Sequence, residues 1–299
     1  MMFRNQKIIY LQLSGRLGNQ LFQLSYAHEL ARMFSCEVQP FFDSFHRPTS
    51  ETSDLVTGGF QCAHVRPAIE SNWMGNIVRL CDKLGVYFNR YRISSLVSFL
   101  GIHRQVDSHF PGPVFRRQPW LVTGFFIDQK YANKHQEVVA SEITSLLKSH
   151  CIGSSVMQKI ENLGEYQMMH IRRGDFVNNG ANFGLLSLNY YLSNRTDHPL
   201  VVAIENEIEV SNFATALKPD IILTKENSTV WETLLAISKA NDVVLSNSTF
   251  AWWGGFLASL NGSVVRFPVP FYLHQDNLNK YLNFRYFSPV QSLFDNDER

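Results

Sequence analysis

Four ionisable side chains lie within six residues, directly after a short apolar run. They are His170, Arg172, Arg173 and Asp175, and Gly174 stands among them. Two guanidinium groups at the end of a strand are costly to bury unpaired. A turn that carries both suits a doubly charged oxyanion such as a pyrophosphate, which arginine binds through two parallel hydrogen bonds. The alternative interpretation is a surface ion-pair cluster in which Asp175 satisfies the arginines.

A second polar cluster follows an apolar strand near residue 245 and opens a helix. Asn247, Ser248 and Thr249 are its candidate binding residues, since helix amino termini present free N–H groups to anions. The alternative is a capped helix with Trp252 and Trp253 in the core, because Ser, Asn and Thr are favoured at N-caps. The arginine cluster at another strand end favours phosphate binding here.

A glycine turn lies near the start of the chain. Gly15, Gly18 and Asn19 separate an apolar strand at residues 7–13 from a helical pattern at residues 20–34. Such a strand, turn and helix can bind an anion, although Gly-x-x-Gly turns are common in α/β proteins. We expect one long helix at residues 129–148 as well.

The second half of the chain alternates between short apolar runs and helical patterns. This alternation predicts a parallel sheet covered on both faces, with ligands at the carboxyl ends of the strands. We place a domain boundary near residue 150, giving domains 1–150 and 151–299, and expect a disordered tail at residues 295–299. Strands are expected at residues 166–171, 200–204, 220–223, 243–246 and 264–267, and helices at residues 188–194, 207–217, 230–239 and 250–260.

Composition restricts the partners and the compartment. The chain has 299 residues and a net charge of +1, so nucleic acid binding is not expected. Its four cysteines form no Cys-x-x-Cys pair, the start shows no signal peptide, and no apolar run approaches the ~20 residues that span a bilayer. We therefore expect a cytoplasmic protein. Residues 66–117 carry eight Lys or Arg against three acids, which suits either a solvated face or peripheral contact with an anionic membrane surface.

Three segments together resemble the bacterial α-1,2-fucosyltransferases, which belong with the blood-group-type α-1,2 enzymes. They are Gly15-Arg16-Leu17-Gly18-Asn19-Gln20-Leu21-Phe22-Gln23, His170-Ile171-Arg172-Arg173-Gly174-Asp175-Phe176 and Ser246-Asn247-Ser248-Thr249-Phe250-Ala251-Trp252-Trp253-Gly254. Their order and spacing, and the chain length, are similar to those of that family.

The resemblance implies an α/β fold of two Rossmann-like domains, of the GT-B type, with a cleft between them and GDP-fucose bound in the second domain. It implies an inverting reaction that needs no metal. It assigns Arg172 to the β-phosphate of the donor, His170 to the pyrophosphate or ribose, and Ser248 and Thr249 to phosphate. The first domain would supply the acceptor side, and its glycine turn would approach the phosphate or fucose.

Two positions depart from the family pattern. Arg16 stands where the family usually has glycine, a feature similar to the protein O-fucosyltransferases, and Glu205-Asn206-Glu207 replaces a Ser-Asp-Asp segment. Glu205 is the candidate for the guanine edge, and Asp175 is either the general base or a structural partner of the arginines. The expected acceptor is a galactose-terminated, lipid-linked glycan at the inner face of the membrane. Another linkage or acceptor, or nucleotide-sugar binding without catalysis, stays open.

Overall fold

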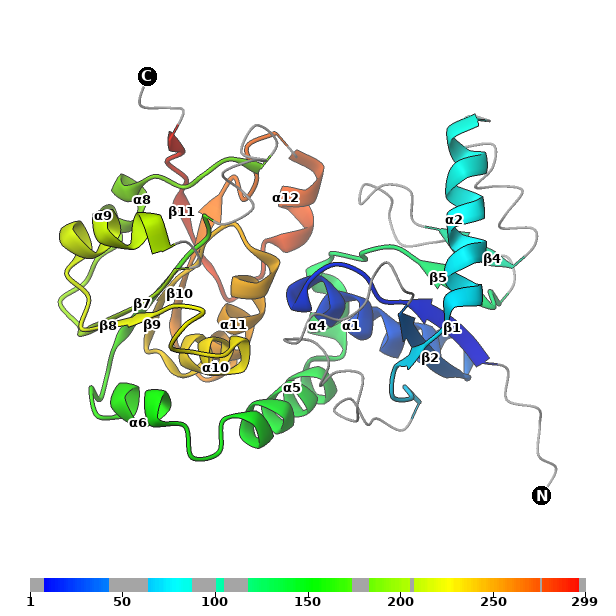
Figure 1. Cartoon of the computed structure of the whole chain (residues 1–299), viewed down its shortest axis with the longest axis horizontal. Helices are drawn as coiled ribbons and strands as arrows, with labels where there is room; N and C mark the ends of the chain where they lie inside the picture. Colours follow the sequence, from blue (N-terminus) through cyan, green and yellow to red (C-terminus); the bar gives the residue numbers. More distant parts are fainter. Residues whose placement is uncertain are drawn as a thin grey trace. The chain divides into compact units, whose positions relative to one another are not determined.

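The computed structural model describes residues 8–42, 64–87, 101–104, 118–173, 183–204, 207–274 and 276–295. The chain forms two compact units, Met1–Leu146 and Leu147–Arg299. Helix α5 (Gln136–His150) runs across this division, and the path of the chain can be followed by colour in Figure 1. Each unit is an α/β structure with a parallel sheet of its own.

The first unit is built on a five-stranded parallel sheet. Strand β1 (Ile8–Gln12) pairs with β2 (Glu37–Phe42) on one side and with β5 (Leu121–Thr123) on the other. The edges are β3 (Ile69–Glu70) and β4 (Ile102–Arg104), which gives the order β3-β2-β1-β5-β4. The helices are α1 (Leu17–Phe34), α2 (Asn72–Tyr87) and α4 (Gln129–Lys134). Helix α1 is buried along most of its length, including polar residues such as Gln20, Gln23 and Glu29.

The second unit is built on a six-stranded parallel sheet in the order β11-β10-β9-β6-β7-β8. Counted from β6, this order is 6-5-4-1-2-3, the doubly wound order of dinucleotide-binding folds. The expected fold class of two Rossmann-like α/β units is therefore confirmed. The strands are β6 (Gln167–Ile171), β7 (Leu200–Ile204), β8 (Ile221–Leu223), β9 (Asp242–Val244), β10 (Val264–Val269) and β11 (Ser288–Gln291). The helices are α6 (Ser155–Glu161), α8 (Leu188–Ser193), α9 (Glu207–Leu217), α10 (Val230–Lys239), α11 (Thr249–Leu260) and α12 (Asp276–Leu282).

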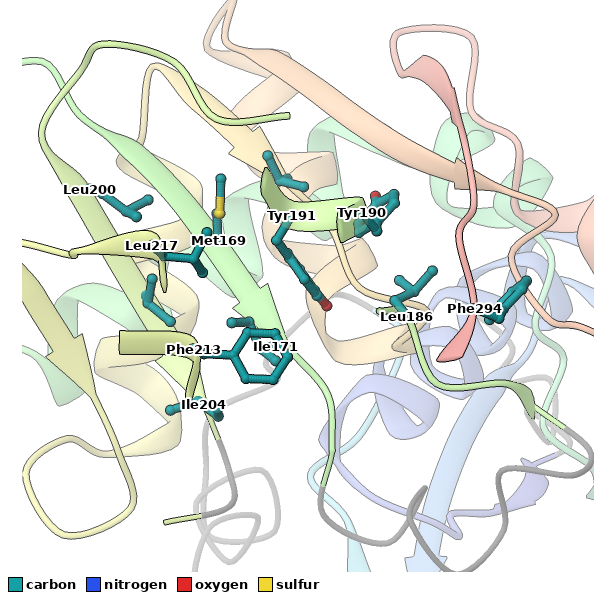
Figure 2. Packing of buried hydrophobic residues seen from close by; sticks show 12 residues of the cluster. Met169, Ile171, Leu186, Tyr190, Tyr191, Leu200, Ile204, Phe213, Leu217 and Phe294 are labelled. Atoms are coloured by element: carbon teal, nitrogen blue, oxygen red, sulfur yellow. The ribbon is translucent and has the colours of Figure 1, made fainter. Parts of the chain in front are cut away.

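Strand β6 presents different residues to the two faces of this sheet, because successive side chains on a strand point to opposite sides. Met169 and Ile171 pack in the core cluster with Tyr191 of α8 and Phe213 of α9, as Figure 2 shows. The ring of His170, between them in sequence, instead lies 5.6 Å from the ring of Phe250 in α11. The α8 and α9 face thus receives Met169 and Ile171, and the α11 face receives His170.

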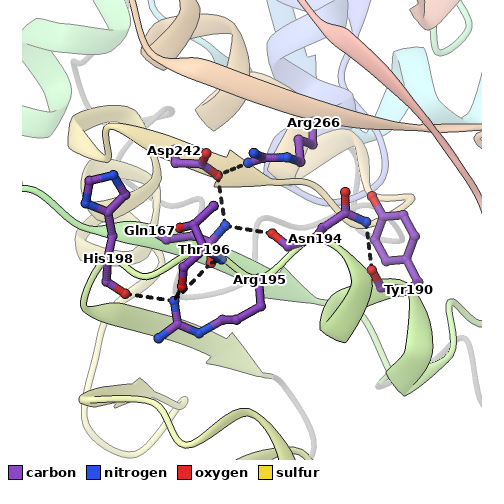
Figure 3. Close-up of polar contacts among 8 residues, drawn as sticks. All are labelled: Gln167, Tyr190, Asn194, Arg195, Thr196, His198, Asp242 and Arg266. Atoms are coloured by element: carbon purple, nitrogen blue, oxygen red, sulfur yellow. Dashed lines mark hydrogen bonds and ion pairs between the residues drawn. The ribbon is translucent and has the colours of Figure 1, made fainter.

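A polar network stabilises the amino edge of the same sheet, away from the strand ends that carry the predicted site (Figure 3). Gln167 donates from Nε2 to the Asn194 carbonyl (2.8 Å) and to the Asp242 carboxylate (2.9 Å), and its Oε1 accepts from the Thr196 amide (3.1 Å). Asp242 also pairs with Arg266. Both polar atoms of the Gln167 side chain have partners, and so does the Asp242 carboxylate, so this edge is structural.

Several expected elements agree with the structure and others do not. Strand β7 and helices α9 and α10 have the expected bounds. The expected single helix at residues 129–148 is wrong: α4 and α5 are separated at His135, whose φ of −112° and ψ of 28° lie outside the helical region. Helix α1 begins three residues earlier than expected, at Leu17, so Gly18 and Asn19 belong to its first turn. The expected disorder of residues 295–299 is wrong for Asp295, which forms an ion pair.

Candidate functional site

The sheet of the second unit reverses its strand order between β6 and β9. At such a switch point the loops after the two strands diverge, and ligands of doubly wound folds bind there. Residues 170–173 follow or end β6, and residues 245–248 follow β9. The structure therefore brings the two polar clusters of the sequence to one edge of one sheet.

His170 and Ser246 connect the two strand ends. His170 Nδ1 and Ser246 Oγ lie 2.7 Å apart in a hydrogen bond, and both residues are buried. Burial, together with a smaller effect of the positive charge of Arg172, lowers the pKa of His170 to about 3. The imidazole is thus neutral at physiological pH, and Ser246 fixes the orientation of its ring.

Arg172 is 8% exposed and lies on the His170 side of the strand by the alternation of β6. Its charge acts on His170 and also on Tyr272. Burial raises the pKa of Tyr272 above its ordinary value, and Arg172 opposes that rise. A buried positive charge that follows a strand at the switch point is suited to bind an anionic group.

Arg173 contacts a different set of residues. Its Nη1 donates to the Asp295 carboxylate (2.6 Å) and to the Leu186 carbonyl (3.4 Å), and the guanidinium lies over the Phe213 ring, 5.5 Å from its centroid. Leu186 and Phe213 belong to the core cluster on the side of the sheet that α8 and α9 cover. The two adjacent arginines therefore lie in different environments. This differs from the expectation that a single turn presents both guanidinium groups to one anion.

The amino terminus of α11 lies at the same strand end. Helix α11 begins at Thr249, one residue earlier than expected, so Ser248 holds the N-cap position with extended backbone. The Ser248 side chain makes no capping hydrogen bond within the part of the chain that the structure describes. The Ser248 amide itself donates to the Ser246 carbonyl (2.8 Å). The first turn of α11 starts at Thr249, and the Ser248 hydroxyl does not cap it. The helix dipole and the first-turn amides of α11 can therefore act on a ligand anion.

Asn247 ties this loop to a neighbouring segment. Its Nδ2 donates to the carbonyls of Phe183 (3.1 Å) and Gly184 (2.9 Å). Its Oδ1 is buried and accepts no hydrogen bond from the residues described in the structure. A buried acceptor without a donor costs about 1–3 kcal/mol, so a ligand hydroxyl or N–H group at this position would be favoured.

Two tyrosines that the sequence analysis did not single out support both strand ends. The Tyr190 hydroxyl donates to the Leu245 carbonyl (2.8 Å), and the Tyr191 hydroxyl donates to the His170 carbonyl (3.2 Å). Burial raises the pKa of both hydroxyls well above the ordinary value. The signal for them was an adjacent tyrosine pair in an expected helix, because a buried tyrosine hydroxyl needs a polar partner.

The glycine turn of the first unit lies at the carboxyl end of β1, beside the end of β5. Gly15 has a φ of +75°, and a Cβ there would lie 2.6 Å from Asn19 Nδ2, so only glycine fits. Buried Gln20 donates to the Gly15 carbonyl (2.8 Å), and buried Gln23 donates to the Gly124 carbonyl (2.7 Å). The predicted residues Gly15, Gly18 and Asn19 thus form a braced turn at a second strand end.

Two predicted site residues, Asp175 and Glu205, lie outside the described residues, as does Gly174. Within the described ranges, no group of three or more His, Cys, Asp or Glu side chains is arranged to hold a metal ion. None of the helices described is both long and apolar enough to cross a membrane. Cys36, Cys81 and Cys151 are free thiols.

Comparison with known proteins identifies the family of this chain. The O-antigen biosynthesis glycosyltransferase WbnK of Escherichia coli is 22% identical over 87% of this chain and 93% of its own length. The alpha-1,2-colitosyltransferase of Escherichia coli is 22% identical over 92% of this chain and 95% of its own length. The fucosyltransferase NodZ from Bradyrhizobium is 11% identical, with a TM-score of 0.49 over 85% of this chain and 94% of its own. The profile of glycosyl transferase family 11 matches residues 114–280, which include the loops after β6 and β9, so the chain belongs to glycosyl transferase family 11.

Proposed function

We propose that this glycosyltransferase is a galactoside α-1,2-fucosyltransferase that moves L-fucose from GDP-fucose to the 2-hydroxyl of a galactose. The observation that carries the proposal is the position of Arg172 and the amino terminus of α11, which follow adjacent parallel strands at the switch point. Two sources of positive potential at one sheet edge suit the pyrophosphate of a nucleotide sugar. The similarity to an O-antigen biosynthesis glycosyltransferase of Escherichia coli supports a surface polysaccharide repeat unit as the acceptor.

In the proposed reaction, the galactose oxygen forms a bond to the anomeric carbon of fucose on the face opposite GDP. The bond from that carbon to the β-phosphate oxygen breaks, and the stereochemistry inverts. Negative charge builds on the departing pyrophosphate, where Arg172 and the first-turn amides of α11 would stabilise it without a metal ion. The hydroxyl proton passes to a general base, for which Asp175 is our candidate.

The other predicted residues take supporting roles in this proposal. Neutral His170 offers its second ring nitrogen to the pyrophosphate or ribose, and Ser248 and Thr249 bind phosphate from the helix terminus. Asn247 offers its buried Oδ1 as an acceptor. Glu205 would meet the guanine edge, and Gly15, Gly18 and Asn19 would approach the sugar. Arg173 is assigned a positioning role below, because its partners are protein groups.

A second donor is favoured by one specific observation, the similarity to a colitosyltransferase. Colitose differs from fucose by the absence of the 3-hydroxyl. A site that binds that hydroxyl through a hydrogen bond rejects the deoxy sugar strongly, whereas an apolar pocket discriminates weakly. Turnover of GDP-fucose at a much higher kcat/KM than GDP-colitose supports the fucosyl assignment, and the reverse ratio would replace it.

The test is acceptor-dependent release of GDP from GDP-fucose in the presence of EDTA, with lactose or N-acetyllactosamine, followed by linkage analysis of the product. Arg172→Ala should lower kcat by about 10²–10³, and Arg172→Lys should recover little, because an ammonium cannot copy the guanidinium geometry. Arg195→Ala is the matched control, since Arg195 lies in the network at the opposite edge of the sheet. It should lower the melting temperature while leaving kcat unchanged. Absence of GDP binding by the wild type would overturn the proposal.

A further inference from the structure

A bridging segment, residues 183–187, connects the candidate site to another part of the chain. On the site side, it accepts both hydrogen bonds of the Asn247 side-chain amide, through Phe183 and Gly184. Asn247 immediately precedes Ser248, the N-cap residue of α11. A displacement of the bridging segment would therefore move the side chain that holds the start of the proposed phosphate-binding helix.

The same bridging segment pairs with a C-terminal segment, residues 293–295. The Ser187 amide donates to the Leu293 carbonyl (2.7 Å), and the Asp295 amide donates to the Leu185 carbonyl (2.9 Å). Leu186 and Phe294 form an antiparallel bridge between these bonds, and both side chains belong to the buried cluster in Figure 2. The end of the chain thus adds a short piece of β-structure to the bridging segment.

Gly184 shows how closely the two segments approach. Its φ is +76°, and a Cβ at this position would lie 2.5 Å from the ring of Phe294. A side chain there would collide with an aromatic ring that is itself 2% exposed. Glycine is therefore required on both conformational and steric grounds.

Arg173 links the C-terminal segment to the other half of the site. It follows Arg172 directly, and its guanidinium pairs with the Asp295 carboxylate at 2.6 Å and with the Leu186 carbonyl at 3.4 Å. The Arg173 side chain is 13% exposed and that of Asp295 is 36% exposed. A mostly buried guanidinium requires a counter-charge, and the described structure supplies it from a residue 122 positions away.

We propose that the C-terminal segment is a positioning element of the donor site, in which Asp295 holds Arg173 and the bridging segment, and through them Arg172 and Asn247. Asp295 and Arg173 are positioning residues, and neither is a donor ligand. The inference rests on the proposed function, because it concerns how the GDP-binding residues are held. It accounts for the partly buried ion pair that Asp295 makes with Arg173.

The test compares Asp295→Asn, Asp295→Glu and the control Glu161→Gln in the full-length chain. Glu161 forms an exposed ion pair with Lys239 in the same unit, at 2.6 Å. We measure the Kd for GDP by calorimetry, then kcat and KM for GDP-fucose, and the melting temperature of each variant. Asp295→Asn should raise the Kd for GDP and the donor KM about tenfold. This is the lower end of the roughly 10–100-fold loss seen when a residue that orients a metal-binding side chain is mutated. The kcat should change less than twofold, Asp295→Glu should restore most of the affinity, and Glu161→Gln should match the wild type.

Three results would overturn the inference. An unchanged Kd for Asp295→Asn, with only a lower melting temperature, would make the ion pair purely structural. Tighter GDP binding by Asp295→Asn would mean that Asp295 competes with the donor phosphate for Arg173. If the wild type binds no GDP, the proposed function fails and the inference fails with it. If the wild type binds GDP and Asp295→Asn binds it equally, only the inference fails.

Discussion

Replacement of Ser246 by alanine tests whether the hydrogen bond between the two strand ends stabilises the second unit. Ser246 Oγ and His170 Nδ1 lie 2.7 Å apart, and both groups are buried. In Ser246→Ala the imidazole nitrogen faces a methyl group in a site that excludes water. An unsatisfied buried polar group costs about 1–3 kcal/mol, so the free energy of unfolding should fall by that amount.

Ser238→Ala is the matched control, because it removes the same hydroxyl from an equally buried position. The Ser238 hydroxyl donates to the Leu235 carbonyl (2.8 Å) within helix α10. That carbonyl keeps its place in the helix, and alanine favours helix by up to about 0.5 kcal/mol. The control should therefore change stability by less than about 0.5 kcal/mol, well below the loss expected for Ser246→Ala.

Urea unfolding followed by tryptophan fluorescence measures both variants, since Trp252 and Trp253 are buried in the same unit. Ser246→Cys should be intermediate, because a thiol is a weak hydrogen-bond donor. GDP affinity should fall in Ser246→Ala and stay unchanged in Ser238→Ala. Equal urea midpoints for Ser246→Ala and Ser238→Ala, with the same dependence of the free energy of unfolding on urea concentration, would contradict a stabilising role of this hydrogen bond.

Three further outcomes are expected. Gly254→Ala would place a Cβ 2.4 Å from Ile237 Cγ2. It should lower the free energy of unfolding by about 1–3 kcal/mol, because α10 and α11 would be overpacked. In urea unfolding, the double variant Gly254→Ala with Ile237→Ala should lose less free energy of unfolding than the sum of the two single variants. The folded-state pKa of His170 is about 3, below the ordinary 6.5. The contribution of His170 to the free energy of unfolding is therefore present above about pH 6.5 and falls by up to about 1.4 kcal/mol per pH unit towards pH 3. In denaturant titrations, His170→Gln should lose less free energy of unfolding than the wild type between about pH 7 and about pH 5. Gln23→Leu leaves the Ser14 amide and the Gly124 carbonyl without their partner, so the melting temperature should drop and turnover should fall, and a wild-type melting temperature would contradict the role of Gln23 in holding the glycine turn.

The elements of the second unit were largely predictable because their signals are local. Strand β7 is a run of buried apolar residues, and α10 has a complete capping box between Thr229 and Glu232. Strand β11 (Ser288–Gln291) was not predicted. Its residues are mostly exposed and include a proline, so nothing in its own sequence resembles a buried strand. Pairing with β10 makes it a strand.

The different environments of Arg172 and Arg173 were partly predictable from the sequence. Alternation along β6 assigns His170 and Arg172 to one face and Ile171 and Arg173 to the other. Two adjacent guanidiniums at a strand end therefore point to different environments unless the chain turns. The ion pair between Arg173 and Asp295 could not be predicted, because Asp295 lies in a short polar segment whose composition is typical of disorder.

The class of the fold and the edge of the sheet where binding groups gather can both be predicted from the sequence. Both follow from short windows: apolar runs that alternate with helical patterns, and polar residues placed directly after strands. Which of those polar groups contact one another depends on the packing of the complete sheet. His170 meets Ser246 across 76 positions and Arg173 meets Asp295 across 122. Such pairs depend on the order of the strands and on which face each side chain occupies, and these emerge only when the whole sheet is packed.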